Sequence, residues 1–344
     1  MSDNTSDEEQ QQQMEEISIC GDIWLEIFAL FSPLELGHTM ALISDRFDAR
    51  VDEHFKTRKW SLGTLQIVRS TNGNGAQIVN NNNQQLPIPQ RPLPNKVIGF
   101  EKIEIRYIDR SVIEFLQSIR RLFNSSGTTV AIATSADQSR SWDIIRQKIW
   151  PLINDNIRHL RVCVASQLDR LRQDFPAILR NCTKLRLIGG LSHAFPAEDN
   201  ANASSAQAVA KWLLTPREGG RSKILFCRHH SGKMEELKRA FVNASEPANF
   251  IIYLHSYGGI EPFELNNNLG ERLELRCFGE YKWLLVRCPI GREEAIWAGL
   301  KKAATAVERQ GFRQWNCIDI TFGGNDIGDG MLDANDEGPS EPKK

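Results

Sequence analysis

The stretch "KIEIRYIDRSVIEFLQSIRRLFNSSGTTVAIAT", from Lys102 to Thr134, contains the patterns of a strand, a helix and a second strand. Its two ends are apolar or alternate as strands do, and its middle is amphipathic. Similar units continue to residue 255, with steps of 27, 30, 25, 39 and 27 residues between equivalent strand positions at Ile103, Val130, Leu160, Leu185, Ile224 and Ile251. This repetition predicts an α/β repeat region over residues 61–260.

One strand and one helix in every ~20 to 30 residues are typical of a leucine-rich-repeat-like solenoid, in which neighbouring units stack to make a continuous core. The segment "ILRNCTKLRLIGGL", residues 178–191, favours this arrangement because an apolar helix end and a Cys precede a Leu-x-Leu strand. A doubly wound α/β sheet is the alternative, since it also alternates strands and helices. In either case we expect an α+β protein.

The segments on either side of the repeats differ in composition. Residues 1–16 are acidic and Gln-rich, and residues 323–344 are rich in Gly, Asp, Asn and Pro, so we expect both to be disordered. An Asn/Gln/Pro-rich stretch near 71–96 is predicted to be an exposed polar loop. Residues 261–322 alternate strongly and are predicted to form a β-rich cap on the open end of the repeats, completed by the strand "WNCIDITF".

The composition argues against several classes of protein. The 42 basic and 43 acidic side chains nearly cancel and are interspersed, so no general field favours nucleic acid or an acidic membrane. The first residues have no basic and apolar pattern, so we expect no secretory signal, and no window approaches the ~18 apolar residues of a spanning helix. The seven cysteines are scattered and form no Cys-x-x-Cys. They are typical of reduced thiols, and we expect a cytoplasmic or nuclear protein.

Motifs that would carry catalysis are missing, and we expect no catalytic residue, no metal site and no cofactor. The glycines of "NGNGAQ", residues 72–77, indicate a tight turn, since a phosphate-binding loop would have a third glycine and a following helix. His229 and His230 are adjacent, so their side chains point to opposite faces of a strand and cannot share a metal. An enzyme on the α/β region remains an alternative with no residue assigned to it.

Near the N-terminus, "DIWLEIFALFSPLELG", from Asp22 to Gly37, is apolar around more than half of the predicted helix that opens it. Ser32-Pro33-Leu34-Glu35 is a capping box that starts a second helix, and residues 45–56 form a third. A three-helix unit over residues 17–60 is near the lower size limit for independent folding. Its surplus apolar surface indicates a protein interface.

The residue order of this unit resembles the F-box, and the whole arrangement resembles the expanded F-box families of nematodes. Matching positions include Ile23, Trp24, Ile27, Phe28, Pro33, Leu36, Ser44, Phe47 and Trp60, whereas Ile19-Cys20 replaces Leu-Pro and Gly37 replaces a Leu. The resemblance implies a Skp-type adaptor bound through Ile19, Ile23, Trp24, Ile27, Phe28, Pro33 and Leu36.

Through the adaptor, the resemblance also implies a cullin-RING ubiquitin ligase, in which this chain is a non-catalytic substrate receptor. The C-terminal region would bind a protein substrate whose identity the sequence does not indicate. The alternative is a non-catalytic interaction scaffold without ubiquitin ligase coupling. The expected partners are therefore proteins, with no nucleic acid and no membrane among them.

Overall fold

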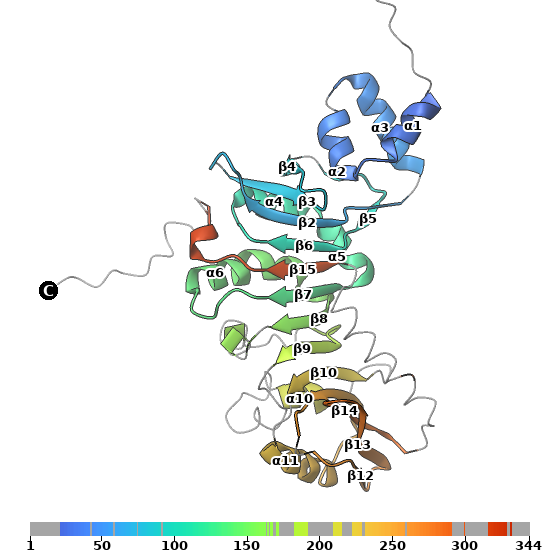
Figure 1. Ribbon diagram of the computed structural model, residues 1–344, viewed down its shortest axis with the longest axis vertical. Helices are drawn as coiled ribbons and strands as arrows, with labels where there is room; N and C mark the ends of the chain where they lie inside the picture. The colour runs from blue at the N-terminus through green and yellow to red at the C-terminus, as the bar shows by residue number, and fades with distance from the viewer. Residues whose placement is uncertain are drawn as a thin grey trace, which may run out of the picture. The chain divides into compact units, whose positions relative to one another are not determined.

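The computed structural model describes residues 21–41, 43–57, 59–73, 75–90, 92–162, 164, 166–167, 170–171, 182–191, 209–214, 222–228, 231–258, 260–290, 299, 316–328 and 331. The chain divides into two compact units, one up to residue 58 and the other from residue 59 onward. The first unit is helical, and the second is built on a large, mostly parallel sheet (Figure 1). The predicted α+β class is therefore confirmed. The boundary lies two residues earlier than expected, because Trp60 begins a strand of the second unit.

The first unit contains α1 (Gly21–Phe28), the short α2 (Pro33–Glu35), a π-helical turn η1 (Leu36–Met40) and α3 (Asp45–Thr57). Helix α2 starts where the capping box predicted. The Ser32 amide donates to Glu35 Oε2 at 2.6 Å, and the Glu35 amide donates to Ser32 Oγ at 3.3 Å. The two bonds satisfy amide groups that an uncapped helix start would leave free, so the chain turns sharply between α1 and α2.

The main sheet of the second unit has thirteen described strands in the order β12-β13-β14-β11-β10-β9-β8-β7-β15-β6-β2-β3-β4. A parallel run occupies its middle: β2 (Thr64–Arg69), β6 (Lys102–Ile105), β15 (Cys317–Ile320), β7 (Thr128–Ile132), β8 (Ile157–Val162), β9 (Leu187–Leu191), β10 (Lys223–Arg228) and β11 (Phe250–His255). Antiparallel strands flank the run: β3 (Ala76–Asn80) and β4 (Gln85–Pro87) on one side, and β14 (Lys282–Pro289), β13 (Glu271–Gly279) and β12 (Phe263–Asn266) on the other. A separate pair joins β1 (Trp60–Ser61) to β5 (Val97–Gly99).

A row of aliphatic side chains in the core of this unit crosses ten strands. Each member pairs in register with the next and is almost completely buried: Leu65, Ile103, Ile318, Val130, Leu160, Ile188, Leu225, Ile252, Leu285 and Leu275. The row continues from the parallel strands into the antiparallel ones without a break. The repeats and the cap therefore share this part of the hydrophobic core.

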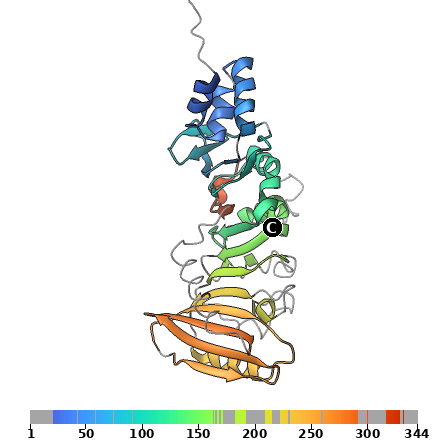
Figure 2. The same ribbon diagram turned by 90° about the vertical axis from the view of Figure 1, so that its right-hand side faces the viewer.

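Helices cover one face of the parallel run (Figures 1 and 2). They include α4 (Arg110–Ser118), α5 (Arg120–Ser126), α6 (Ser139–Ile144), the π-helical η2 (Ile145–Ile149), α7 (Trp150–Ile153), the 3-10 turn η3 (Asn154–Asn156), α10 (Val209–Leu214) and α11 (Ser231–Val242). Phe115 and Trp142 bury their side chains from this layer. On β6 and β15, Lys102, Glu104 and Asp319 alternate with the buried row and so occupy the opposite face.

The strand "WNCIDITF" does not complete the cap, so that part of the prediction is wrong. Its β15 lies between β6 and β7, parallel to both, as the red arrow in Figure 1 shows. The chain then continues into a 3-10 turn, η6 (Gly324–Asp326), and Ile327 forms a bridge with Ile108. Residues 323–328 were expected to be disordered, but they are held by this bridge and by a 2.7 Å bond from the Gly328 amide to the Ile108 carbonyl.

Two further expectations change. The Asn/Gln/Pro-rich stretch is not simply a loop, since β3 and β4 form an antiparallel extension of β2. Its proline-rich end is fastened by Arg121, which donates to the carbonyls of Val97 at 2.8 Å and Pro94 at 2.6 Å. The repeat positions assigned to Leu185, Ile224 and Ile251 belong to Ile188, Leu225 and Ile252, which pair in one register with Leu160.

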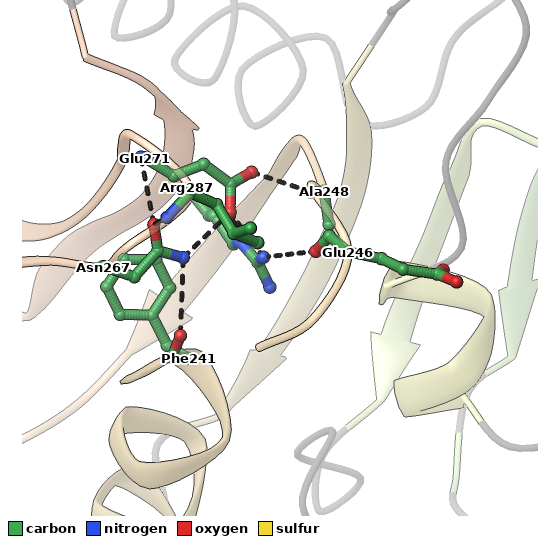
Figure 3. Close-up of polar contacts among 7 residues, drawn as sticks. Phe241, Glu246, Ala248, Asn267, Glu271 and Arg287 are labelled. Carbon is green, nitrogen blue, oxygen red and sulfur yellow. Dashed lines mark hydrogen bonds and ion pairs between the residues drawn. The ribbon is translucent and has the colours of Figure 1, made fainter. Parts of the chain in front are cut away.

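A buried ion pair links β13 to β14 inside the cap, and its hydrogen bonds to Glu246 and Ala248 attach the cap to the preceding segment (Figure 3). Arg287 donates to Glu271 Oε2 from Nε at 3.0 Å and from Nη2 at 2.5 Å, and both side chains are at most 3% exposed. Arg287 also donates to the Glu246 carbonyl at 3.0 Å, and Glu271 accepts from the Ala248 amide at 2.7 Å. Asn267 donates to Glu271 Oε2 at 3.0 Å. Because both side chains find their hydrogen-bond partners within the fold, the ion pair has a structural role.

Candidate functional site

An exposed apolar stripe runs along α1 and the turn that follows it. Ile23 and Ile27 lie one turn apart on α1, and Leu30 and Phe31 follow in the turn after it, where their amides donate to the carbonyls of Ile27 at 3.0 Å and Phe28 at 3.2 Å. Ile23 is 50% exposed, Leu30 is 85% exposed and Phe31 is 37% exposed. We call these four residues the α1 stripe. Ile43, 58% exposed, is the other large apolar side chain given to solvent among the described residues of the first unit, and exposed apolar surface of this kind is typical of a binding site.

The neighbouring side of α1 is already used inside the unit. The rings of Trp24 and Phe47, on α3, meet edge to face at 4.7 Å between centroids. Phe28 is fully buried and lies 5.7 Å from the ring of His54, also edge to face. Val51 completes the inner side of α3. Because this packing fixes α1 on α3, the position of the stripe does not depend on a bound partner.

The structure separates the sequence-predicted adaptor residues into two groups. Ile23 is exposed, while Ile27 and Trp24 are half-buried on α1. Phe28, Pro33 and Leu36 are buried in the chain itself, and Ile19 lies outside the described residues. The residues of the first group, on α1, can contact a partner directly. The buried residues of the second group can only hold the contacting residues in place. Leu30 and Phe31 were not among the predicted adaptor residues, and they lie in the turn that follows α1.

Gly37, the position where the F-box pattern has a Leu, is exposed in the π-helical turn. A Cβ atom built on it would meet nothing within 4 Å. The backbone there is not in the left-handed region, so the position does not require glycine. The departure from the pattern therefore removes a side chain from the surface without opening a gap in the core.

The described cysteines do not form a nucleophilic site. Burial raises the pKa of Cys182 and that of Cys317 to about 12, and burial also raises the pKa of Cys227. These three thiols are protonated at neutral pH, and a thiol attacks only as its thiolate. Cys277 is the exposed cysteine among those described. Cys20 and Cys163 lie outside the described residues.

A charged group crosses β6 and β15 on the face opposite the helices. Lys102 Nζ lies 2.5 Å from Asp319 Oδ2 and 3.5 Å from Glu104 Oε2, and Arg106 Nε lies 2.6 Å from Glu104 Oε1. Burial alone would raise the pKa of Glu104, but the hydrogen bond from Arg106 and the charges of Lys102 and Arg106 lower it. Burial alone would lower the pKa of Lys102, but Asp319 and Glu104 raise it. Oppositely charged partners here neutralise one another, as in a structural network.

The described part of the chain offers little support for other chemistry. The described residues hold no group of three or more His, Cys, Asp or Glu placed to bind a metal. Gly73 and Gly75 form the turn between β2 and β3 with positive φ angles, and a strand follows them, so the phosphate-loop alternative has no helix to support it. His229 and His230 are outside the described residues. Within the described ranges, no helix has both the length and the apolar character that a membrane span requires.

Comparison of the chain with protein-family models gives no match, and comparisons with curated proteins and with solved structures give none either.

Proposed function

We propose that this chain is the substrate-recognition subunit of a Skp-cullin-F-box E3 ubiquitin ligase. The first unit is the F-box, and the α1 stripe is the part of it that contacts the Skp-type adaptor. The observation that carries the proposal is that one side of α1 packs on α3 through Trp24 and Phe28, while Ile23, with Leu30 and Phe31 in the turn after α1, is exposed and Ile27 is half-buried beside them. The order of short helices and the capping box at Ser32 and Glu35 support it.

In this scheme the chain forms and breaks no bond itself. It holds a substrate near the ubiquitin-loaded enzyme, so that the gain in rate comes from raised effective concentration and orientation. The second unit is the substrate receptor. Strands β7 to β11 follow one another in sequence order and are all parallel, which supports the leucine-rich-repeat-like arrangement over a doubly wound sheet, whose strand order reverses at a switch point.

Affinity capture of the full chain tests the proposal. We expect both a Skp-type adaptor and a cullin to be recovered with it. Ile23→Asp places a charge in the middle of the apolar contact and should abolish recovery of both. Because Ile23 is half exposed and lies in the first turn of α1, where the helix dipole favours acidic residues, this substitution should leave the unit folded.

Ala29→Asp is the matched control, because it adds the same charge to an exposed position just beyond α1 that is not part of the stripe. It should retain adaptor and cullin. Recovery of the adaptor without a cullin would support the alternative of a scaffold that is not coupled to ubiquitination. Equal recovery with Ile23→Asp and the unchanged chain would remove the α1 stripe as the contact surface.

A further inference from the structure

Three rings meet at one end of β11 and β14, on the second unit. They belong to His255, the last residue of β11, to Tyr257, which follows it, and to Tyr281, in the turn before β14. The ring centroids are 5.0 Å apart for His255 and Tyr257, 5.3 Å for Tyr257 and Tyr281, and 6.4 Å for His255 and Tyr281. Tyr257 is 74% exposed and Tyr281 is 43% exposed. We call these three residues the tyrosine platform.

The backbone fixes the platform before any partner arrives. The buried Ser256 donates its amide hydrogen to the Tyr281 carbonyl at 2.9 Å, which ties the two tyrosine-bearing turns together. The Ser256 hydroxyl donates to the Gly258 carbonyl at 3.0 Å. In the sheet, His255 pairs with Lys282, directly after Tyr281. Exposed aromatic side chains on a pre-ordered backbone lose little freedom when they bind, which is typical of contact residues.

Tyr281 is kept in a backbone conformation that suits it poorly. Its φ angle is 61°, in the left-handed region that glycine and asparagine occupy most readily. A turn whose only task is to connect β13 to β14 has no need of a bulky aromatic at such a position. Residues held in sparsely populated conformations cluster at functional sites. The strained backbone indicates that tyrosine occupies this position for the contacts of its ring and not for the geometry of the turn.

Acidic side chains accompany the platform. Glu280 precedes Tyr281 and is exposed, and Glu261 is exposed at the end of the segment that leads from Tyr257 toward β12. If the register of β12 on β13 is continued outward, Glu261 reaches the level of Cys277, close to the same turn. Within the described part of the chain, neither Glu280 nor Glu261 has an ion-pair partner. The platform is therefore an aromatic surface with Lys282 directly after it and with two exposed carboxylates, Glu280 and Glu261, that have no ion-pair partner among the described residues.

We propose that the tyrosine platform binds an arginine-bearing segment of a protein partner. A guanidinium group is planar and weakly hydrated, so it stacks on a tyrosine face while its N–H groups reach a carboxylate such as Glu280. A lysine ammonium can pair with the carboxylate but stacks less well, and a proline ring can stack but makes no use of the charge. Because the platform lies in the unit proposed to hold the substrate, this site rests on the proposed function and names its substrate class.

Fluorescence anisotropy with the full chain and a labelled Gly/Ser peptide that contains two arginines tests the proposal. Tyr281→Gly removes the ring and places in the turn the residue that the φ angle favours, so it should stabilise the chain while it weakens binding about tenfold. Tyr257→Ala should weaken binding to a similar extent, and Tyr281→Phe should retain it. Glu280→Gln should weaken it several-fold at low salt and less at high salt.

Peptides in which lysine or proline replaces both arginines are the matched probes, and they should bind more weakly. Tighter binding of the proline peptide would overturn the assignment of arginine. Wild-type affinity in both Tyr281→Gly and Tyr257→Ala, or no binding of the arginine peptide by the unchanged chain, would overturn the site. No adaptor is present in this assay, and Ile23→Asp should bind the peptide as the unchanged chain does. A failure of the arginine peptide to bind the platform is therefore distinguishable from a failure of the first unit to bind the adaptor.

Discussion

The buried ion pair between Glu271 and Arg287 gives a quantitative test of how the cap is attached. Arg287→Met removes the two hydrogen bonds to Glu271 and the one to the Glu246 carbonyl. The Glu271 carboxylate, 2% exposed, then keeps its bonds from Ala248 and Asn267 but loses its counter-charge. Breaking a buried pair from one side costs about 3 to 5 kcal/mol, because an uncompensated charge remains in the interior.

The double variant Glu271→Gln, Arg287→Met removes that charge and keeps a side-chain acceptor for the Ala248 amide. We therefore expect it to be less destabilised than Arg287→Met alone. The assay is urea unfolding of the full chain followed by circular dichroism, with the two single variants and the double variant closing the cycle. Arg110→Ala is the control, because the Arg110 and Glu114 side chains are 86% and 53% exposed and such a pair contributes at most about 0.5 kcal/mol. A loss for Arg287→Met no larger than that for Arg110→Ala, or a double variant no more stable than the single one, would refute the reasoning.

Three further outcomes are expected. Gly37→Ala should stabilise the first unit by about 0.5 to 1 kcal/mol, because the added Cβ meets nothing within 4 Å and alanine loses less backbone freedom than glycine in the helical turn. Thermal unfolding of the variant measures the change in stability. A loss of stability would contradict the expectation. The pKa of Glu104 is lowered from its ordinary value of 4.5, so the ionised side chain stabilises the fold at pH values above 4.5, and this stability is lost as the pH falls through the pKa of the folded state. Glu104→Gln should therefore flatten the acid side of the plot of unfolding free energy against pH. An unchanged acid side would show that the charged network is not coupled to folding. Among the described cysteines, the exposed Cys277 should react first with a thiol reagent at pH 8, because burial raises the pKa values of Cys182 and Cys317 to about 12. Peptide mapping identifies the modified residue. Early labelling of Cys182 or Cys317 would contradict this expectation.

Local patterns in the sequence were sufficient to predict most elements of the second unit. Alternation of strands and helices placed β6 to β11 correctly, and the breaks at Asn267 to Gly270 and at Gly279 to Tyr281 mark the turns of the antiparallel strands. Strand neighbours were harder to predict. The aliphatic pattern at Ile318 and Ile320 shows that β15 is buried, but any strand of the parallel run would suit such a pattern equally well. Its position between β6 and β7 is decided by contacts with residues about 215 and about 190 positions away in the sequence.

The candidate site shows a related limit. Apolar periodicity identified α1 as more apolar than its own packing requires, yet it did not separate the residues that face inward from those left to solvent. Phe28, Pro33 and Leu36 have the same apolar character as Ile23, and only the packing against α3 and the capped turn shows that they are buried. Tyr281 carries no sequence signal of its left-handed backbone, because that conformation is normally indicated by glycine or asparagine.

The contact between the α1 stripe and a Skp-type adaptor is tested most directly by calorimetric titration of the purified full chain with that adaptor. We expect saturable one-to-one binding that Ile23→Asp abolishes and Ala29→Asp retains, with circular dichroism showing that both variants keep their helices. Absence of binding by the unchanged chain, or equal affinity in the chain that carries Ile23→Asp, would contradict the assignment of the first unit as an F-box.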